Sequence, residues 1–434
     1  MTQPRRRADA ARNDDLLLDA ALELLREKGP DRITALDLAR LAKLTTGAVY
    51  ARYENNEEIL VGLWQHRISG PMRTFFEAAL PALTPGIHRA DAQAIMAKAI
   101  SNPHGPLRPG VSLLIASARI PELHEIIVPE IQGWLREMGI SDDRSDVASL
   151  YKLKIIGFVL GCLYFAAADM FDFDDWETIK PLAHYILEHP SIEDVADIPI
   201  AAPPSIAVTT DNEIRDALVN GAARVIARGG VESATTQRIA RAAALPPSAL
   251  FSEYRTRQAL FSDVAEKLLH LIYRGARAED ILPATDQIPG ITGTPTDFND
   301  PRLVMHRQFL TQRGTMTSMA LLAPPAKEQR RIRLEFHLAA ITDPVIKDAL
   351  LKADITATEH ATNLLNSLFG IPVALAAPTV RMARLLVQGS LLLEEISDSL
   401  NGRNLTHIYK PLADGFSQMI INQPLSRTQI RDFK

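Results

Sequence analysis

The feature that most constrains the fold of this 434-residue chain is an internal repeat. A shift of 201 positions, from Leu17 to Leu218, aligns two segments without a gap. Ten residues of the first segment recur in order in the second: Leu17, Ala21, Gly29, Thr34, Ala39, Arg40, Ala42, Leu44, Ala48 and Tyr53 match Leu218, Ala222, Gly230, Thr235, Ala240, Arg241, Ala243, Leu245, Ala249 and Tyr254. Self-similarity of this kind indicates a duplicated structural unit, so the sequence predicts two tandem units.

The repeat continues more weakly toward the end of each unit. Residues 116–121 resemble 339–344, and residues 179–182 resemble 408–412. Residues 198–210 are rich in proline and small side chains and lack helical periodicity, which predicts a linker between the units.

Helical spacing dominates the rest of the chain. Apolar residues recur every three or four positions near the start of both units, as at Leu17, Ala21 and Leu24. Regions rich in proline and glycine at 102–110 and 283–301 predict breaks between helices, and no segment alternates as a strand does. The predicted fold class is all-α.

Composition excludes several classes of protein. A single cysteine cannot form an internal disulfide, and no apolar run follows the three arginines of residues 5–7 as in a signal peptide. The longest apolar stretch, 155–168, is short of the ~20 residues of a membrane-spanning helix. We therefore expect a cytoplasmic protein without a membrane partner. Its net charge of -5 requires any nucleic-acid site to be local.

Residues 34–53 predict two short helices joined by a tight turn. Thr34 is placed to cap the first helix, with Asp37 three residues later, and Thr45 is placed to cap the second, which we expect from Thr46 to about Tyr53. Small residues at 39, 42 and 48 allow the helices to cross closely. This pattern is typical of a helix-turn-helix, whose second helix enters the DNA major groove.

The spacing suggests which side chains contact DNA in the first copy. Thr46, Gly47 and Val49 begin the second helix and are candidates for base edges, while Tyr50 and Arg52 are candidates for flanking phosphates. Thr34, at a helix N-terminus, offers a hydroxyl and backbone amides to another phosphate.

At these residues the chain resembles the TetR family of transcriptional regulators. In residues 34–60 the family pattern is matched by Leu38-Ala39, Gly47, Tyr50 and Tyr53, and the family's phosphate-binding lysine falls at Asn56. The resemblance implies double-stranded operator DNA as partner. The complete set of predicted DNA contacts in this copy is Thr34, Thr45, Thr46, Gly47, Val49, Tyr50, Arg52, Tyr53 and Asn56.

The second copy, residues 235–261, diverges where DNA is approached. Ser248 replaces the glycine, Phe251 replaces the tyrosine, and Glu253 stands where the first copy has Arg52. We therefore expect the first copy to dominate DNA affinity, with Arg255 and Arg257 partly offsetting Glu253. The predicted contacts of this copy are Thr235, Pro247, Ser248, Phe251, Tyr254, Arg255 and Arg257.

The resemblance also implies a domain organisation. We expect a basic arm (1–13), a first DNA-binding domain (14–60), a helical ligand-binding and dimerisation domain (61–197), the linker (198–210), a divergent DNA-binding domain (211–261) and a second helical domain (262–434). The last two helices of each unit, at 147–171 with 176–187 and at 378–400 with 405–421, would pair as a four-helix bundle. One chain could then form a pseudo-dimer that binds an asymmetric site, whereas a homodimer of chains would prefer a palindrome.

Family resemblance further implies a small ligand, for which we expect an apolar molecule. Trp134, Cys162 and Phe165 are candidate ligand contacts, with plain core packing as their alternative interpretation. The sequence offers no catalytic set, metal cluster or cofactor motif. Two alternatives to a ligand-responsive repressor stay open: a helical adaptor that does not bind DNA, and an all-α enzyme.

Overall fold

The computed structural model describes residues 3–83, 89–102, 104–188, 207–274 and 297–422, and every regular element in these ranges is a helix. The first unit contains α1 (Gln3–Lys28), η1 (Pro30–Arg32), α2 (Ala35–Ala42), α3 (Thr46–Tyr50), α4 (Asn56–Leu63), the π-helical turn η2 (Trp64–Ile68), α5 (Ser69–Leu83), α6 (Arg89–Ser101), α7 (Leu107–Ser117), α8 (Pro121–Glu137), α9 (Val147–Ala167) and α10 (Phe173–Glu188). The all-α prediction is confirmed.

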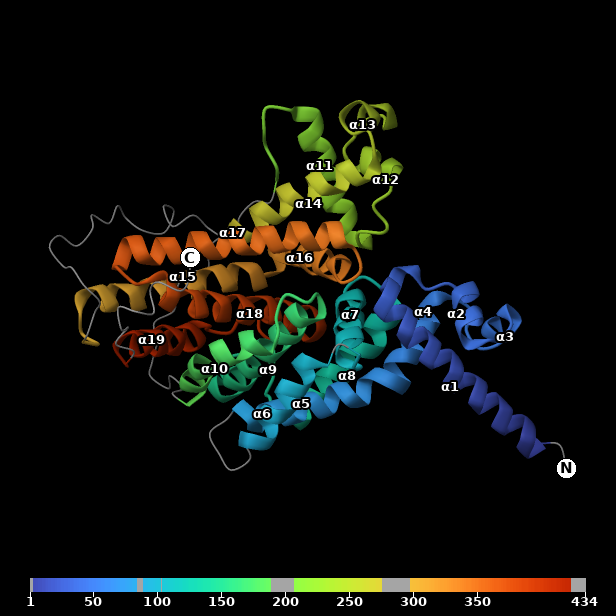
Figure 1. The fold of residues 1–434 in the computed structure, drawn as a ribbon, viewed down its shortest axis with the longest axis horizontal. Coiled ribbons are helices and arrows are strands. Elements are labelled where there is room, and N and C mark those ends of the chain that lie inside the picture. Colours follow the sequence, from blue (N-terminus) through green and yellow to red (C-terminus); the bar gives the residue numbers. More distant parts are fainter. Residues whose placement is uncertain (1–2, 84–88, 103, 189–206, 275–296, 423–434) are drawn as a thin grey trace.

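The second unit repeats this order. It contains α11 (Glu213–Gly229), α12 (Thr236–Ala242), α13 (Pro247–Glu253), α14 (Arg257–Arg274), α15 (Pro301–Leu322), η4 (Pro324–Ala326), α16 (Lys327–Ala340), α17 (Pro344–Phe369), α18 (Val373–Ser397) and α19 (Thr406–Asn422). In Figure 1, α1–α4 lie at the right of the helical body and α11–α14 lie above it. Both small helical groups thus stand at the outside of one shared body.

One predicted boundary differs in the structure, and two predicted segments lie mostly outside the described residues. The expected basic arm at 1–13 is helical from residue 3 onward and continues into the first helix of the predicted DNA-binding domain as α1. Most of the expected linker, 198–206, and most of the expected loop, 283–296, lie outside the described residues.

Helix α9 is apolar on all sides, and the body is built around it. The Asp146 side chain caps it by accepting a hydrogen bond from the Ala148 amide at 3.0 Å. Within the described residues this is the one helix long and apolar enough to span a bilayer, and 89% of its apolar window is buried inside the protein. It therefore serves here as the central core helix.

The two units join where α9 crosses α18, and glycines bring the backbones into contact. A Cβ atom built on Gly161 would lie 1.9 Å from the carbonyl oxygen of Leu385. One built on Gly389 would lie 1.8 Å from the carbonyl oxygen of Gly157. Both distances are far inside the ~3.5–4.0 Å of an ordinary non-bonded contact, so side chains larger than hydrogen are excluded at this crossing. Figure 1 shows the two helices together at the centre.

Helices α10 and α19 complete a four-helix bundle with α9 and α18. The buried Arg403, in the turn before α19, donates to the carbonyl oxygens of Ser141 at 2.6 Å and Asp143 at 2.8 Å, in the loop before α9. Arg381 on α18 pairs with Asp175 on α10. The helices predicted to pair at the end of each unit thus pack together within one chain.

Replacing Gly161 by alanine should destabilise the protein, because the new methyl group overlaps the Leu385 carbonyl. We expect the free energy of unfolding to fall by about 3 kcal/mol, as for other overpacked cores. Urea denaturation of the full chain measures it.

Gly133→Ala in α8 is the matched control, since nothing lies within 4 Å of a Cβ atom there. The same substitution should there raise the free energy of unfolding by ~0.5–1 kcal/mol. Equal changes in the two variants would contradict the close backbone contact.

Candidate nucleic-acid interface

The first predicted DNA-binding domain folds as a helix-turn-helix with both predicted caps in place. Thr34 Oγ1 accepts from the Asp37 amide at 3.1 Å, and Thr45 Oγ1 accepts from the Ala48 amide at 3.2 Å. Lys43 ends α2 in the left-handed region, with φ 55°. The two threonines thereby fix where each helix begins, and the turn sets the angle between them.

The second domain repeats the same turn with different residues. Ala244 takes φ 56°, and the Leu245 amide donates to the Ala240 carbonyl at 3.0 Å. Helix α13 starts at Pro247, a favourable residue for a first helical position, although Pro246 before it supplies no capping side chain. The geometry of the unit is therefore kept although its second cap is lost.

Helix α3 presents a small set of side chains to solvent. Thr46 and Gly47 are exposed on its first turn, and Tyr50 is 61% exposed. Val49 is only 1% exposed because it faces the domain core, so its prediction as a base contact is corrected. Leu250 occupies the same buried place in α13.

Three other predicted contacts of the first domain also have structural roles. Arg52 pairs with Asp14 on α1 and donates to the Ala48 carbonyl at 3.2 Å. The half-buried Tyr53 packs its ring edge and hydroxyl over Gly62. The amide nitrogen of Asn56 donates to the Pro30 carbonyl at 3.1 Å, so this nitrogen binds the protein itself in the position where the family lysine binds phosphate.

The exposed side chains of the second domain differ in chemistry from those of the first. Phe251 is 65% exposed at the position of Tyr50, and Thr235, Pro247, Ser248 and Arg255 are also exposed. The side chain of Arg257 lies outside the described residues. Glu253 accepts a hydrogen bond from the Asn212 side chain at 3.0 Å.

Tyr254 is the second correction. It is 2% exposed, and its hydroxyl donates to Asp263 and accepts from Arg215. Burial is the main cause that raises the pKa of this phenol, so it stays protonated. A side chain held in this way supports the domain core and is not placed to bind a phosphate.

The two interfaces also differ in charge. Residues 34–60 hold three basic and four acidic side chains, whereas residues 235–261 hold four basic and one acidic. Arg238 and Arg241 on α12 are exposed, as is Arg40 on α2 at the position equivalent to Arg241. The ten identities that reveal the repeat do not show this difference, which lies in the charged residues that differ between the two copies.

Comparison with known families agrees with this geometry. The model of bacterial regulatory proteins of the tetR family matches residues 17–63 and again residues 218–264. The chain therefore contains two DNA-binding domains of the tetR family. It is a DNA-binding regulator of the TetR type with two tandem units, each match running from the first helix of a DNA-binding domain into its fourth. Comparison with curated proteins finds no match.

The two TetR-type domains meet at equivalent loops. Arg32, in η1 of the first domain, pairs with Glu232, in the corresponding turn of the second. Gly29 and Gly230 precede these turns, both with positive φ, at 75° and 77°. A Cβ atom on Gly230 would lie 2.8 Å from Arg119 Nε, so only glycine fits this approach.

A buried ion-pair cluster, which we call the junction, lies beneath these loops. Arg119, after α7, binds Asp31 at 2.6 Å and Glu335 of α16 at 2.7 Å. Burial raises the pKa of Glu335 to about 7, while the Arg119 charge acts in the opposite direction. The junction connects the foot of the first DNA-binding domain to the core of the second unit.

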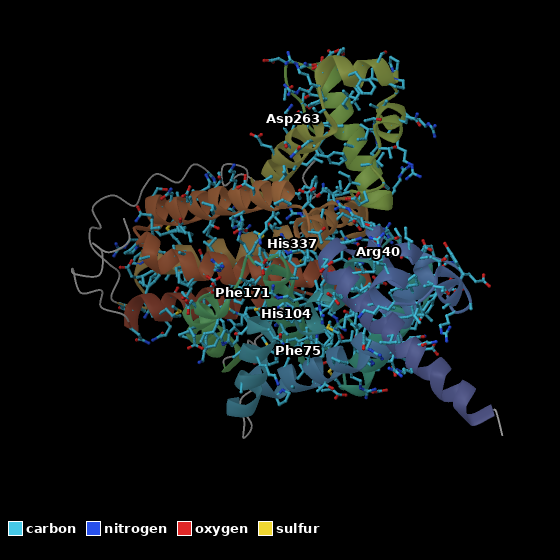
Figure 2. All side chains as sticks on the ribbon, turned by 45° about the vertical axis from the view of Figure 1, so that its right-hand side comes forward. Arg40, Phe75, His104, Phe171, Asp263 and His337 are labelled. Carbon is cyan, nitrogen blue, oxygen red and sulfur yellow. The ribbon has the colours of Figure 1, made fainter. Side chains whose placement is uncertain are left out.

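Helix α16 also contacts α9 in the interior of the protein. The His337 ring stacks on Tyr164 with centroids 3.5 Å apart, and the Tyr164 hydroxyl donates to the Arg333 carbonyl at 3.2 Å. Burial lowers the pKa of His337 to about 3, so its ring is neutral. In Figure 2, His337 lies in the helical body, below Asp263 of the second DNA-binding domain and to the left of Arg40 of the first.

Of the three residues predicted to contact a ligand, only one lines a cavity in the structure. Trp134 stacks on Trp64 with centroids 6.1 Å apart, and Cys162 is fully buried, with its thiol pKa raised by burial. Neither lines the two cavities considered below, whereas Phe165 lines the larger one. Sequence reasoning missed Arg313 and Arg333, which line the smaller cavity, because no local motif marks them.

Arg119→Met should destabilise the protein in a pH-dependent way. Without Arg119 the pKa of Glu335 rises further, so this carboxyl is protonated at low pH but buried, charged and without Arg119 at high pH. We expect a loss of about 3 kcal/mol near pH ~8 and a much smaller loss near pH ~5, measured by urea denaturation.

Arg73→Met is the matched control, since Arg73 pairs with Glu77 and Glu137 on the surface. Its effect should stay below about 1 kcal/mol at both pH values. A loss from Arg119→Met that is the same at both pH values would show that Glu335 does not titrate in this way.

Tyr50→Phe and Phe251→Tyr form a reciprocal pair for DNA binding. Removing the exposed hydroxyl from α3 should weaken binding roughly tenfold, because a hydrogen bond to a charged phosphate is lost. Adding it to α13 should strengthen binding. Fluorescence anisotropy with a DNA site selected for the wild-type chain measures both, and an unchanged affinity for Tyr50→Phe would remove Tyr50 from the interface.

Proposed function

We propose that this chain is a transcriptional repressor that binds its operator as a single-chain pseudo-dimer and releases it when a small molecule binds the helical core. The observation that carries the proposal is the four-helix bundle of α9, α10, α18 and α19 within one chain. In the TetR family these helices are the ones expected to pair between two subunits. One chain therefore supplies both halves of the dimer.

The domain division follows the repeat. Residues 14–60 and 211–261 form the two DNA-binding domains, and residues 61–197 and 262–434 form the two cores, with α1 extending the first DNA-binding domain toward the N-terminus. The contact between Arg32 and Glu232 supports a fixed relation between the two DNA-binding domains.

The two DNA-binding domains contribute differently to DNA recognition. Thr46, Gly47 and Tyr50 of the first domain provide the groups expected at base edges and phosphates. The second provides exposed arginines, including Arg238 and Arg241, whose charge attracts the DNA backbone without reading its sequence. Base specificity resides mainly in the first half of the operator, and the second half contributes affinity that depends on salt.

Helix α16 provides a route from ligand to DNA. It lines a cavity through Arg333 and reaches the junction through Glu335, two residues later on the same helix. A ligand that favours a shifted α16 would move the second DNA-binding domain, because α16 packs against α11. The spacing of α3 and α13 would then no longer match two successive major grooves.

The preferred DNA site and the mass of the bound species test the pseudo-dimer. Selection from genomic fragments should return an asymmetric site, and multi-angle light scattering should show one chain on each duplex. A perfect palindrome bound by two chains would contradict the proposal. Absence of any enriched sequence, with no loss of retained DNA for Tyr50→Phe, would instead favour the adaptor interpretation.

A further inference from the structure

A cavity of about 640 Å³ lies where the two units meet. The end of α9, the turn after it and the start of α10 line it from the first unit, and α17 and α18 line it from the second. Its walls are mainly apolar and include Phe165, Met170, Phe171, Val373, Ala377 and Leu385. The volume falls within the ~300–1,000 Å³ of sites for drug-sized molecules, so the cavity has room for such a molecule.

The charged side chains that line this cavity are paired with one another. Arg381 of α18 pairs with Asp175 of α10, and Arg384 of α18 pairs with Asp354 of α17 at 2.8 Å. Burial is the main cause that raises the pKa of both carboxyls, which indicates surroundings of low polarity. A charged ligand would lose its hydration here and would meet cations and carboxylates that are already matched. The cavity therefore favours a neutral ligand.

Two uncharged polar side chains of the wall also have partners inside the protein. Thr358 Oγ1 donates to the Asp354 carbonyl at 2.8 Å, and the side-chain amide of Asn366 donates to the Ile371 carbonyl at 2.9 Å. The surface that remains for a ligand is therefore mostly hydrocarbon, and burial of apolar area supplies most of the binding free energy.

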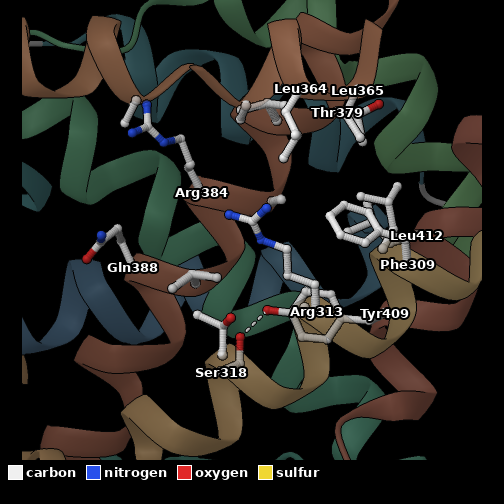
Figure 3. A pocket seen from close by; sticks show the side chains of 18 of the residues that line it. Phe309, Arg313, Ser318, Leu364, Leu365, Thr379, Arg384, Gln388, Tyr409 and Leu412 are labelled. Carbon is white, nitrogen blue, oxygen red and sulfur yellow. Dashed lines mark hydrogen bonds between the residues drawn. The ribbon is translucent and has the colours of Figure 1, made fainter. Parts of the chain in front are cut away.

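A smaller cavity, of about 220 Å³, lies beside this one, with Arg384 lining both. Figure 3 shows the smaller cavity, with Arg313 in the middle of the side chains drawn and Ser318 hydrogen-bonded to Tyr409. Its volume is below the ~300–1,000 Å³ of sites for drug-sized molecules. We therefore assign the ligand to the larger cavity.

The corresponding place on the other side of the α9–α18 crossing is filled by the protein. Helices α8 and α17 precede α9 and α18 in their units, and α8 packs against α18. Gln132 of α8 donates to the Ser397 carbonyl at 3.1 Å, and Arg144 donates to the Asp398 carbonyl at 2.6 Å. The buried Arg403 and its bonds to the loop before α9 close the same region. Helix α17, in contrast, faces the first unit across the cavity.

We infer that this cavity, which we call the inter-unit site, binds one neutral, largely apolar molecule per chain. A symmetric dimer presents two equivalent sites, whereas this chain keeps one, between the end of α9 and α17. The ligand packs on Phe165 and Phe171 of the first unit and on Leu385 of the second, and it leaves the two ion pairs of the wall intact. The inference deepens the proposed function, on which its regulatory consequence rests.

Helix α17 connects the inter-unit site to the second DNA-binding domain. It lines the site through Asp354 and Thr358, and it packs against both α14 and α16. Helix α14 is the fourth helix of that domain. A ligand that favours a conformation with α17 further from α9 would therefore also move α14 and α16, and with them the second DNA-binding domain.

Two matched fluorescent probes test the neutral class with the full chain. N-phenyl-1-naphthylamine is neutral, and 8-anilino-1-naphthalenesulfonate has the same aromatic body with an added sulfonate. The neutral probe should bind at one molecule per chain and at least about tenfold more tightly, because the sulfonate must lose its hydration. Equal or tighter binding of the sulfonate, two equivalent neutral molecules per chain, or no saturable binding of the neutral probe would overturn the inference.

Ala377→Phe and Ala374→Phe test the site itself, since both alanines line it. Ala377→Phe fills part of the cavity and should weaken binding of the neutral probe at least about tenfold. Ala374 is exposed, so Ala374→Phe should leave the core intact and weaken binding less. If circular dichroism shows that Ala377→Phe is misfolded, Ala374→Phe decides the result.

Ala357→Phe is the matched control, because Ala357 lines the smaller cavity and is half-buried like Ala377. It should leave the affinity for the neutral probe unchanged. Affinities that stay the same in both site variants, or a loss in Ala357→Phe alone, would place the ligand elsewhere and overturn the assignment.

The regulatory role is measured separately, by anisotropy of the selected DNA site labelled with a red fluorophore. Loss of DNA affinity on addition of the neutral probe to the wild type, but not to Ala377→Phe, would support both the site and the proposed function. Probe binding that Ala377→Phe abolishes, with DNA affinity unchanged in the wild type, would keep the site and reject release by the ligand.

Discussion

The backbone contact between α9 and α18 is the constraint on which the rest of the molecule depends. Because Gly161 and Gly389 have no side chains, the two long helices approach so closely that each glycine contacts a backbone carbonyl oxygen of the other helix. Helices α10 and α19 pack against these two to form the bundle, and α7 and α16, which flank the junction, contact α18. Because the two helices belong to one chain, their association does not depend on protein concentration, as it does in a homodimer.

Helix α16 carries an unusual number of buried charges for a core helix. Arg330 pairs with Glu395 of α18 at 2.8 Å, Glu335 pairs with Arg119 at 2.7 Å, and Arg333 lines the cavity. Buried ion pairs contribute little net stability, because desolvation offsets their attraction. Their geometric demands do, however, fix how α16 sits between the units. A displacement of α16 would therefore shift residues that contact both DNA-binding domains.

Much of the fold followed from the sequence, and the failures have physical causes. Thr34 and Thr45 were correctly predicted as caps, because capping depends on the nearest three residues. Val49 and Tyr254 were placed at DNA because spacing along a five- to seven-residue helix does not determine which side faces the core. Arg313 and Arg333 lie on different helices, and only the tertiary packing brings them to one cavity. Local signals therefore determined the elements, while the site depended on contacts distant in sequence.

The second DNA-binding domain has not only lost residues of the first domain but has also gained new interactions in their place. At the positions of Asp14 and Arg52 the second copy has Arg215 and Glu253, so both charges are reversed. Each reversed residue has a new partner: Arg215 binds Asp263 at 3.0 Å, and Glu253 accepts from Asn212 at 3.0 Å.

Asp263 stands at the position of Gly62, where it binds the hydroxyl of Tyr254, whereas Tyr53 packs directly on the glycine. The core of the domain has thus been rebuilt around its changes, and the αL turn at Ala244 is intact. A domain that no longer needed its shape would not require such compensation. The second copy is therefore better described as a stable helix-turn-helix with a different surface than as a decayed copy of the first.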